Sequence, residues 1–170
     1  MVADKMEEKI KGYKCFNKGL VNRYGVKFEI GKTYHAVGQI KYGNDGKGFH
    51  MCKNLEDTLR FFDAINGEID ICKVTGFGKL HKNDDNYNDF YDMYACEYLT
   101  IDELLTREEI IEYGLKLNEI SVKRFISLIH LTDEEIALFK EKYQKNETVL
   151  NYIAYYQEGD KEVFNRKIRR

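Results

Sequence analysis

The sequence contains no proline and no tryptophan. Ordinary proline usage of about 5% would place roughly eight in a chain of this length. Without proline, helices run unkinked and no cis-prolyl bond slows folding. No apolar run approaches the ~20 residues of a membrane-spanning helix, and the opening residues, MVADKMEEKIKGYK, are too polar for a signal peptide. We therefore expect a soluble protein of the cytoplasm that does not associate with membranes.

The net charge and the spacing of the cysteines exclude further classes of protein. The formal net charge of −2 argues against binding to duplex nucleic acid, which relies on clustered basic side chains. The four cysteines, Cys15, Cys52, Cys72 and Cys96, are widely spaced and form no C-x-x-C pair. This spacing predicts reduced thiols rather than a disulfide framework. We expect no cofactor and no bound metal.

Short apolar runs separated by glycine, asparagine and aspartate fill the stretch 10–100 and predict a β-rich domain. Residues 12–18 read as one strand, and residues 26–42 as two strands around a turn. Residues 68–80 predict a strand with a bulge or bend at its glycines. A polar loop joins this strand to the apolar run 90–101, which favours an antiparallel hairpin.

One helix interrupts the predicted sheet. Asn54 is a good N-cap, and Asp57 three residues later resembles a capping box. Leu55, Leu59 and Phe62 then recur at helical spacing, so they form a stripe that packs on the sheet.

Beyond residue 100 the pattern becomes helical. Thr106 with Glu109, and Thr132 with Glu135, are capping boxes that predict two helix starts. We predict an α+β fold: a mostly antiparallel sheet with one packed helix, followed over 101–170 by a bundle of four or five short helices, packed on the sheet or forming a small subdomain. The apolar residues of the bundle predict an internal core or, alternatively, a homodimer face: Ile120, Phe125, Leu128, Ile136 and Phe139.

His50 and Cys52 are the most suggestive chemical pair. They lie two apart in GFHMCKN, so a strand would point both to one face. With Cys15 or Cys72 they would suit zinc, and Cys52 beside a helix start would suit a thiol nucleophile. We interpret the pair as structural, fastening the strand to the helix start.

Acidic and tyrosine side chains cluster between residues 84 and 94. Tyrosine provides contact area at low entropic cost, and the carboxylates complement a basic surface. The loop fails the EF-hand pattern because Asp89 stands where glycine is required. We predict that it is a protein-binding surface formed by Asp84, Asp85, Tyr87, Asp89, Tyr91, Asp92 and Tyr94.

Three stretches, GYKCFNKGL, EIGKTY and GFHMCKNLEDTLRFF, resemble an uncharacterised domain of phage and bacterial proteins. The resemblance covers the N-terminal half. It implies a phage or prophage setting, in the bacterial host cytosol, and brings no established activity or catalytic residue. The matching positions are Gly12, Tyr13, Lys14, Phe16, Asn17, Lys18, Gly31, Lys32, Tyr34, Gly48, Phe49, His50, Cys52, Asn54 and Asp57.

A second, fainter resemblance is to the layout of ADP-ribosyltransferases. It lies in the order of two motifs, TYHAVG followed by GFHMCKNLEDTLRFF. Ala36 departs from that pattern, because a glycine is usual there. The resemblance implies an NAD site in which His35 contacts the ribose, Tyr34 flanks the nicotinamide and Glu97 is the catalytic carboxylate.

Two hypotheses for function follow. The first is a non-enzymatic binding protein that engages a host or defence protein through the acidic tyrosine-rich surface. The alternative is a NAD- or nucleotide-binding enzyme of ADP-ribosyltransferase-like layout that uses Tyr34, His35, His50 and Glu97. Neither hypothesis specifies an oligomeric state.

Overall fold

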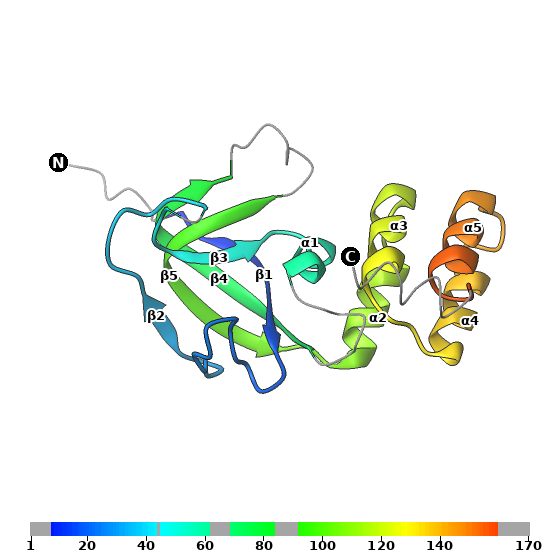
Figure 1. Ribbon diagram of the computed structural model, residues 1–170, viewed down its shortest axis with the longest axis horizontal. Helices are drawn as coiled ribbons and strands as arrows, with labels where there is room; N and C mark the ends of the chain where they lie inside the picture. Colours follow the sequence, from blue (N-terminus) through cyan, green and yellow to red (C-terminus); the bar gives the residue numbers. More distant parts are fainter. Residues whose placement is uncertain (1–7, 44, 62–68, 84–91, 160–170) are drawn as a thin grey trace. The chain divides into compact units, whose positions relative to one another are not determined.

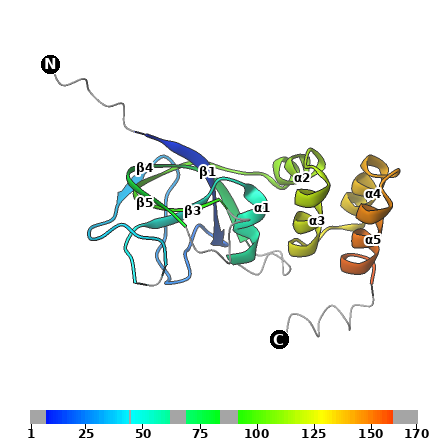
Figure 2. The same cartoon turned by 90° about the horizontal axis from the view of Figure 1, so that it is seen from above.

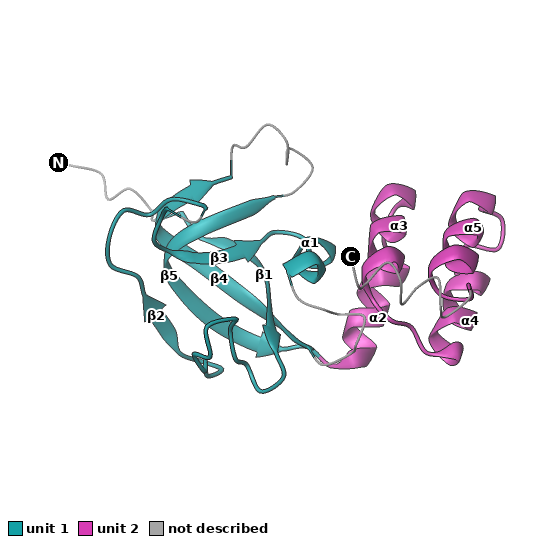
Figure 3. Ribbon diagram, in the orientation of Figure 1, with its two compact units in different colours: residues 1–62, 68–105 teal, residues 63–67, 106–170 magenta. Residues whose placement is uncertain are grey.

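The computed structural model describes residues 8–43, 45–61, 69–83 and 92–159. The chain forms two compact units (Figure 3). The described residues up to Leu105 belong to the first unit, and Thr106–Gly159 belong to the second. The change of unit falls after Leu105 rather than at residue 100 because the last strand continues to Leu104.

The first unit is built on a five-stranded antiparallel sheet (Figure 1). Its order is β2-β5-β3-β1-β4, and β4 also pairs with β5, so that β5, β3, β1 and β4 close on one another. The predicted hairpin is the β4–β5 pair, with a register shift between Phe77 and Leu80 where Gly78 has a positive φ. The strands are β1 (Ile10–Asn17), β2 (Thr33–His35), β3 (Phe49–Cys52), β4 (Ile69–Lys82) and β5 (Met93–Leu104).

Apolar side chains fill the space that the closed strands enclose. The space is narrow, because a Cβ at Gly76 would lie 2.3 Å from the Cys96 sulfur. The buried cluster consists of Ile10, Phe16, Phe28, Met51, Cys72, Val74, Cys96, Leu99 and Ile101.

The segment 26–42 differs from the prediction of two strands, since only β2 forms there. Phe28 is buried and packs on Phe16 with ring centroids 5.2 Å apart, whereas Val26 and Ile30 are about half exposed. Asn22 explains the difference, because its side-chain oxygen accepts hydrogen bonds from backbone N–H groups that a strand would use in its ladder.

The predicted helix after β3 is present and changes to a 3₁₀ turn after Thr58. It consists of α1 (Leu55–Thr58) and a single 3₁₀ turn, η1 (Leu59–Phe61), and it lies beside β1 and β3 (Figure 2). Asn54 has the extended backbone of an N-cap, but its side chain makes no capping bond and donates to Asp57 instead. Leu55 and Leu59 of the predicted apolar stripe are fully buried, and Phe62, its third member, lies outside the described residues.

The second unit contains four helices among its described residues, which confirms the predicted short-helix segment. Both predicted capping boxes are present, at Thr106 and Thr132. Phe125, Ile136 and Phe139 are buried inside the unit and Leu128 is partly buried, so these members of the predicted set belong to an internal core, whereas Ile120 is exposed. No described helix is long and apolar enough to cross a membrane. The helices are α2 (Arg107–Leu115), α3 (Glu119–Leu128), α4 (Asp133–Lys142) and α5 (Glu147–Tyr156).

Candidate ligand-binding site

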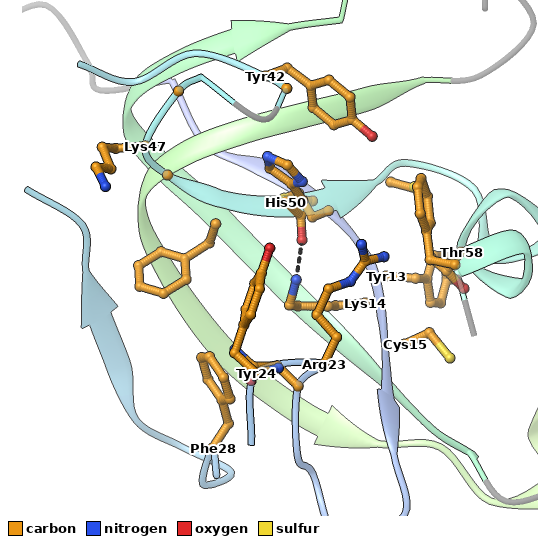
Figure 4. A pocket seen from close by; sticks show the side chains of 18 residues that line it. Tyr13, Lys14, Cys15, Arg23, Tyr24, Phe28, Tyr42, Lys47, His50 and Thr58 are labelled. Carbon is orange, nitrogen blue, oxygen red and sulfur yellow. Dashed lines mark hydrogen bonds between the residues drawn. The ribbon is translucent and has the colours of Figure 1, made fainter. Parts of the chain in front are cut away.

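A cavity of about 700 Å³ opens in the first unit where β1 and β3 separate (Figure 4). These two strands pair at one position only, Tyr13 opposite Cys52. Gly12 brings them together there, because any side chain at this position would strike the Cys52 carbonyl, 2.2 Å from its Cβ. Beyond this crossing the strands diverge, and loops 22–28 and 42–48 supply the remaining walls.

Lys14 occupies the gap between the two strands. It lies on the same side of β1 as the buried residues Ile10 and Phe16. Its Nζ donates a hydrogen bond of 2.5 Å to the backbone carbonyl of His50 and lies 5.7 Å from the centroid of the Phe16 ring. The ammonium thus bonds to a β3 carbonyl where the pairing between the two strands has ended.

The Lys14 ammonium is held in an unfavourable setting. Its burial, with a further contribution from the guanidinium of Arg23, lowers its pKa from 10.5 to about 8. Of the eighteen described residues that line the cavity, three are Lys or Arg and none is Asp or Glu. No described residue forms an ion pair with Lys14, Arg23 or Lys47. The wall is therefore positively charged although the whole chain carries a net charge of −2.

A tight turn presents Arg23 and Tyr24 at the mouth of the cavity. The side-chain oxygen of Asn22 accepts hydrogen bonds from the backbone N–H of Tyr24 at 3.0 Å and of Val26 at 2.9 Å. Tyr24 is 81% exposed although its ring belongs to the cavity wall. Figure 4 shows the Arg23 and Tyr24 side chains entering the cavity on the side of Lys14.

His50 and Tyr42 form the opposite wall as a stacked pair, with ring centroids 4.4 Å apart. Tyr42 is anchored twice, since its backbone N–H donates to Nδ1 of His81 and its hydroxyl donates to the sulfur of Met93. Burial, together with the charges of Lys14 and Arg23, lowers the pKa of His50 from 6.5 to about 4. The imidazole is therefore neutral at neutral pH.

Cys15 and Cys52 also line the cavity, but their thiols are poor nucleophiles at neutral pH. Burial raises the pKa of both thiols to about 12, so neither is a thiolate at neutral pH. This argues against the thiol-nucleophile interpretation of Cys52. Among the described residues no three His, Cys, Asp or Glu side chains are grouped to hold a metal ion, so the zinc interpretation finds no ligand set there.

Comparison with protein families matches residues 10–112 to a domain of unknown function, DUF7666. The chain belongs to this family. The matched segment extends beyond the N-terminal half into α2, and it contains every residue that lines the cavity. No curated protein and no solved structure gives a significant match.

The family segment does not gather the four residues of the ADP-ribosyltransferase-like hypothesis in the cavity. Only His50 lines it. His35 and Glu97 form a pair on neighbouring strands, with 3.6 Å between Nε2 and Oε2, and His35 stacks on Tyr98. Tyr34 packs on Phe28 in the first unit, and its hydroxyl accepts a hydrogen bond from the Glu29 backbone N–H.

The acidic tyrosine-rich surface falls largely outside the described residues, which omit 84–91 and with them Asp84, Asp85, Tyr87, Asp89 and Tyr91. Its two described members both contact a lysine. Asp92 pairs with Lys82 at 3.0 Å, and the Lys53 ammonium lies 5.9 Å from the Tyr94 ring.

Sequence reasoning missed the functional potential of Lys14, Arg23, Tyr24 and Tyr42. One signal was available for Lys14, because it lies in alternation with Ile10, Gly12 and Phe16 on the buried side of its strand. A charge in phase with core residues is rarely tolerated without a role or a partner. Arg23, Tyr24 and Tyr42 lie on loops, and no periodicity marked them.

Proposed function

We propose that the cavity binds a small anionic ligand with a planar ring, of the nucleotide class. The observation that carries the proposal is the desolvated Lys14 ammonium, in a cavity that has no Asp or Glu among its described lining residues. A buried charge without a counter-ion is costly, and a bound anion removes that cost.

The arrangement of the cations favours phosphate as the anion. The Arg23 guanidinium lies close enough to Lys14 and to His50 to lower the pKa of both. The Arg23 charge thus disfavours protonation of Lys14, and the charges of Lys14 and Arg23 both disfavour protonation of His50. A phosphate placed between Lys14 and Arg23 would convert this repulsion into charge-assisted hydrogen bonds.

The remaining wall favours a planar ring. Tyr24, Phe28, Tyr42, Phe49 and Phe61 all line the cavity. Stacking of a base on an aromatic side chain contributes about 1–3 kcal/mol. Ligand cavities ordinarily measure about 300–1,000 Å³, and the observed volume of about 700 Å³ lies within that range. Binding does not require the His35–Glu97 pair, so the proposal is of binding and not of ADP-ribose transfer.

A thermal-shift panel tests the proposal. AMP, NAD and ADP-ribose carry both phosphate and ring, whereas adenosine lacks the phosphate and inorganic phosphate lacks the ring. We expect the first group to stabilise the protein more than either fragment, by about 2.7 kcal/mol at ~100 times the dissociation constant. Lys14→Met should abolish the shift. Lys11→Met is the matched control, because Lys11 is an exposed residue of the same strand.

A flat response to every nucleotide would refute the proposal, as would an equal shift in wild type and Lys14→Met. The protein partner, in a phage or prophage setting and in bacterial cytoplasm, is a separate proposal resting on the sequence pattern of residues 84–94. Reversing the charge of Asp84 and Asp85 should weaken capture of such a partner, and unchanged capture would exclude that surface.

A further inference from the structure

The hydrogen bond from Lys14 Nζ to the His50 carbonyl also determines the direction of the nucleophilic lone pair on that nitrogen. The acceptor is a backbone carbonyl, which takes a hydrogen and cannot receive the nitrogen lone pair. When the side chain is neutral, an N–H therefore points at the His50 carbonyl, and the lone pair points away from it. Figure 4 shows this amine inside the cavity, beside Tyr24 and Arg23.

From this placement we propose that Lys14 forms an imine with the carbonyl group of an aldehyde ligand held in the cavity. The proposal rests on the proposed function, because the same cations and rings would seat an aldehyde that also carries phosphate and an aromatic ring.

The reaction balances without an oxidant or reductant. The neutral Nζ attacks the aldehyde carbon and forms a carbon–nitrogen bond, giving a carbinolamine. Two protons leave nitrogen in total, and they depart with the former carbonyl oxygen as one molecule of water. A carbon–nitrogen double bond remains, and water can reverse the reaction.

Two features of the site favour this chemistry. The lowered pKa of Lys14, about 8, leaves a far larger neutral fraction at neutral pH than an exposed lysine has. The neighbouring Arg23 is a cation that cannot form an imine, so it can hold the anionic part of the ligand while Lys14 reacts.

Pyridoxal 5′-phosphate is a suitable probe because it is a planar aldehyde that carries phosphate. The full chain is incubated with the probe across a pH series and reduced with borohydride, which converts the imine into a stable amine. Peptide mass mapping then locates the label. We expect one dominant site, Lys14, with labelling that rises through a midpoint near pH 8.

Variants separate this inference from the proposed function. Lys14→Arg keeps the positive charge but cannot form the imine, so it should lose the label, whereas the thermal shift of the wild-type protein with AMP tests the proposed function independently. Lys11→Arg, on the same strand, should keep both the label and the thermal shift. AMP should protect Lys14 of the wild-type protein from labelling, a test that needs no substitution.

Labels spread over surface lysines, or a Lys14 label whose midpoint lies near that of exposed lysines, would overturn the imine proposal. If AMP binding persists under those results, the proposed function stands and only the imine fails. If AMP neither shifts the melting temperature nor protects any lysine, both fail.

Discussion

Replacing Lys14 with methionine should change how stability depends on pH. Methionine has a similar length and no charge, so it fills the same gap beside Phe16 without the buried ammonium. At pH 7 both the folded and the unfolded wild-type protein hold the Lys14 proton. The fall in pKa from 10.5 to about 8 then corresponds to about 3 kcal/mol of destabilisation of the folded state.

The sign follows from proton counting. Between pH 8 and 10.5 the unfolded chain keeps a proton that the folded protein has lost, so wild-type stability rises with pH. The penalty is complete below pH 8 and is relieved above it. Between pH 7 and pH 9 the Lys14 contribution should therefore raise wild-type stability by about 1.4 kcal/mol relative to Lys14→Met.

Effects that are the same at pH 7 and pH 9 do not change how the stability difference between wild type and Lys14→Met depends on pH. Loss of the hydrogen bond to the His50 carbonyl costs about 1–3 kcal/mol at either pH, so it shifts the difference between the proteins without changing its slope. The cavity thiols, with pKa values raised to about 12, stay protonated in the folded wild-type protein at both pH values, and removal of the Lys14 charge keeps them so in the variant.

Urea unfolding at pH 7 and pH 9 measures the effect, followed by far-ultraviolet circular dichroism because the chain has no tryptophan. The free energy of unfolding of Lys14→Met minus that of wild type should fall by about 1.4 kcal/mol from the lower pH to the higher. Lys11→Met should show no such change. A difference that stays constant between the two pH values would refute the burial of an uncompensated Lys14 charge.

Two further predictions concern the same site. The pKa of His50 is lowered to about 4, so the unfolded chain binds more protons between pH 6.5 and 4 and wild-type stability should fall on acidification. His50→Phe, which keeps a ring beside Tyr42, should flatten this part of the acid-unfolding curve. An unaltered curve would show that His50 does not cause the loss of stability. Gly12→Ala places a Cβ 2.2 Å from the Cys52 carbonyl, so it should lower the free energy of unfolding by about 1–3 kcal/mol and weaken AMP binding. A neutral or stabilising result in urea unfolding would contradict the close approach of β1 and β3.

Local chemistry accounts for the parts of the fold that the sequence predicted well. Capping boxes at Thr106 and Thr132 place two helix starts because a side chain three residues away completes each one. The β4–β5 hairpin follows from two apolar runs joined by one polar loop. These signals involve neighbours along the chain, so their energy does not depend on how distant segments meet.

Other local signals were overridden by the tertiary structure. The alternation of Val26, Phe28 and Ile30 is typical of a strand, yet only Phe28 is buried. Its ring fits beside Phe16, and hydrogen bonds to the Asn22 side chain hold the backbone in a loop. Alternation alone does not show whether a partner strand exists to accept the ladder.

The sequence by itself determined the α+β class, the absence of long apolar helices, and the alternation that put Lys14 on the buried side of its strand. Only the tertiary structure decided that β1 and β3 part after a single pair, leaving a cavity at that lysine. The physical reason is that burial and repulsion depend on residues far apart in sequence. Arg23 lowers the pKa of Lys14, and both cations lower the pKa of His50, because the fold brings these residues together.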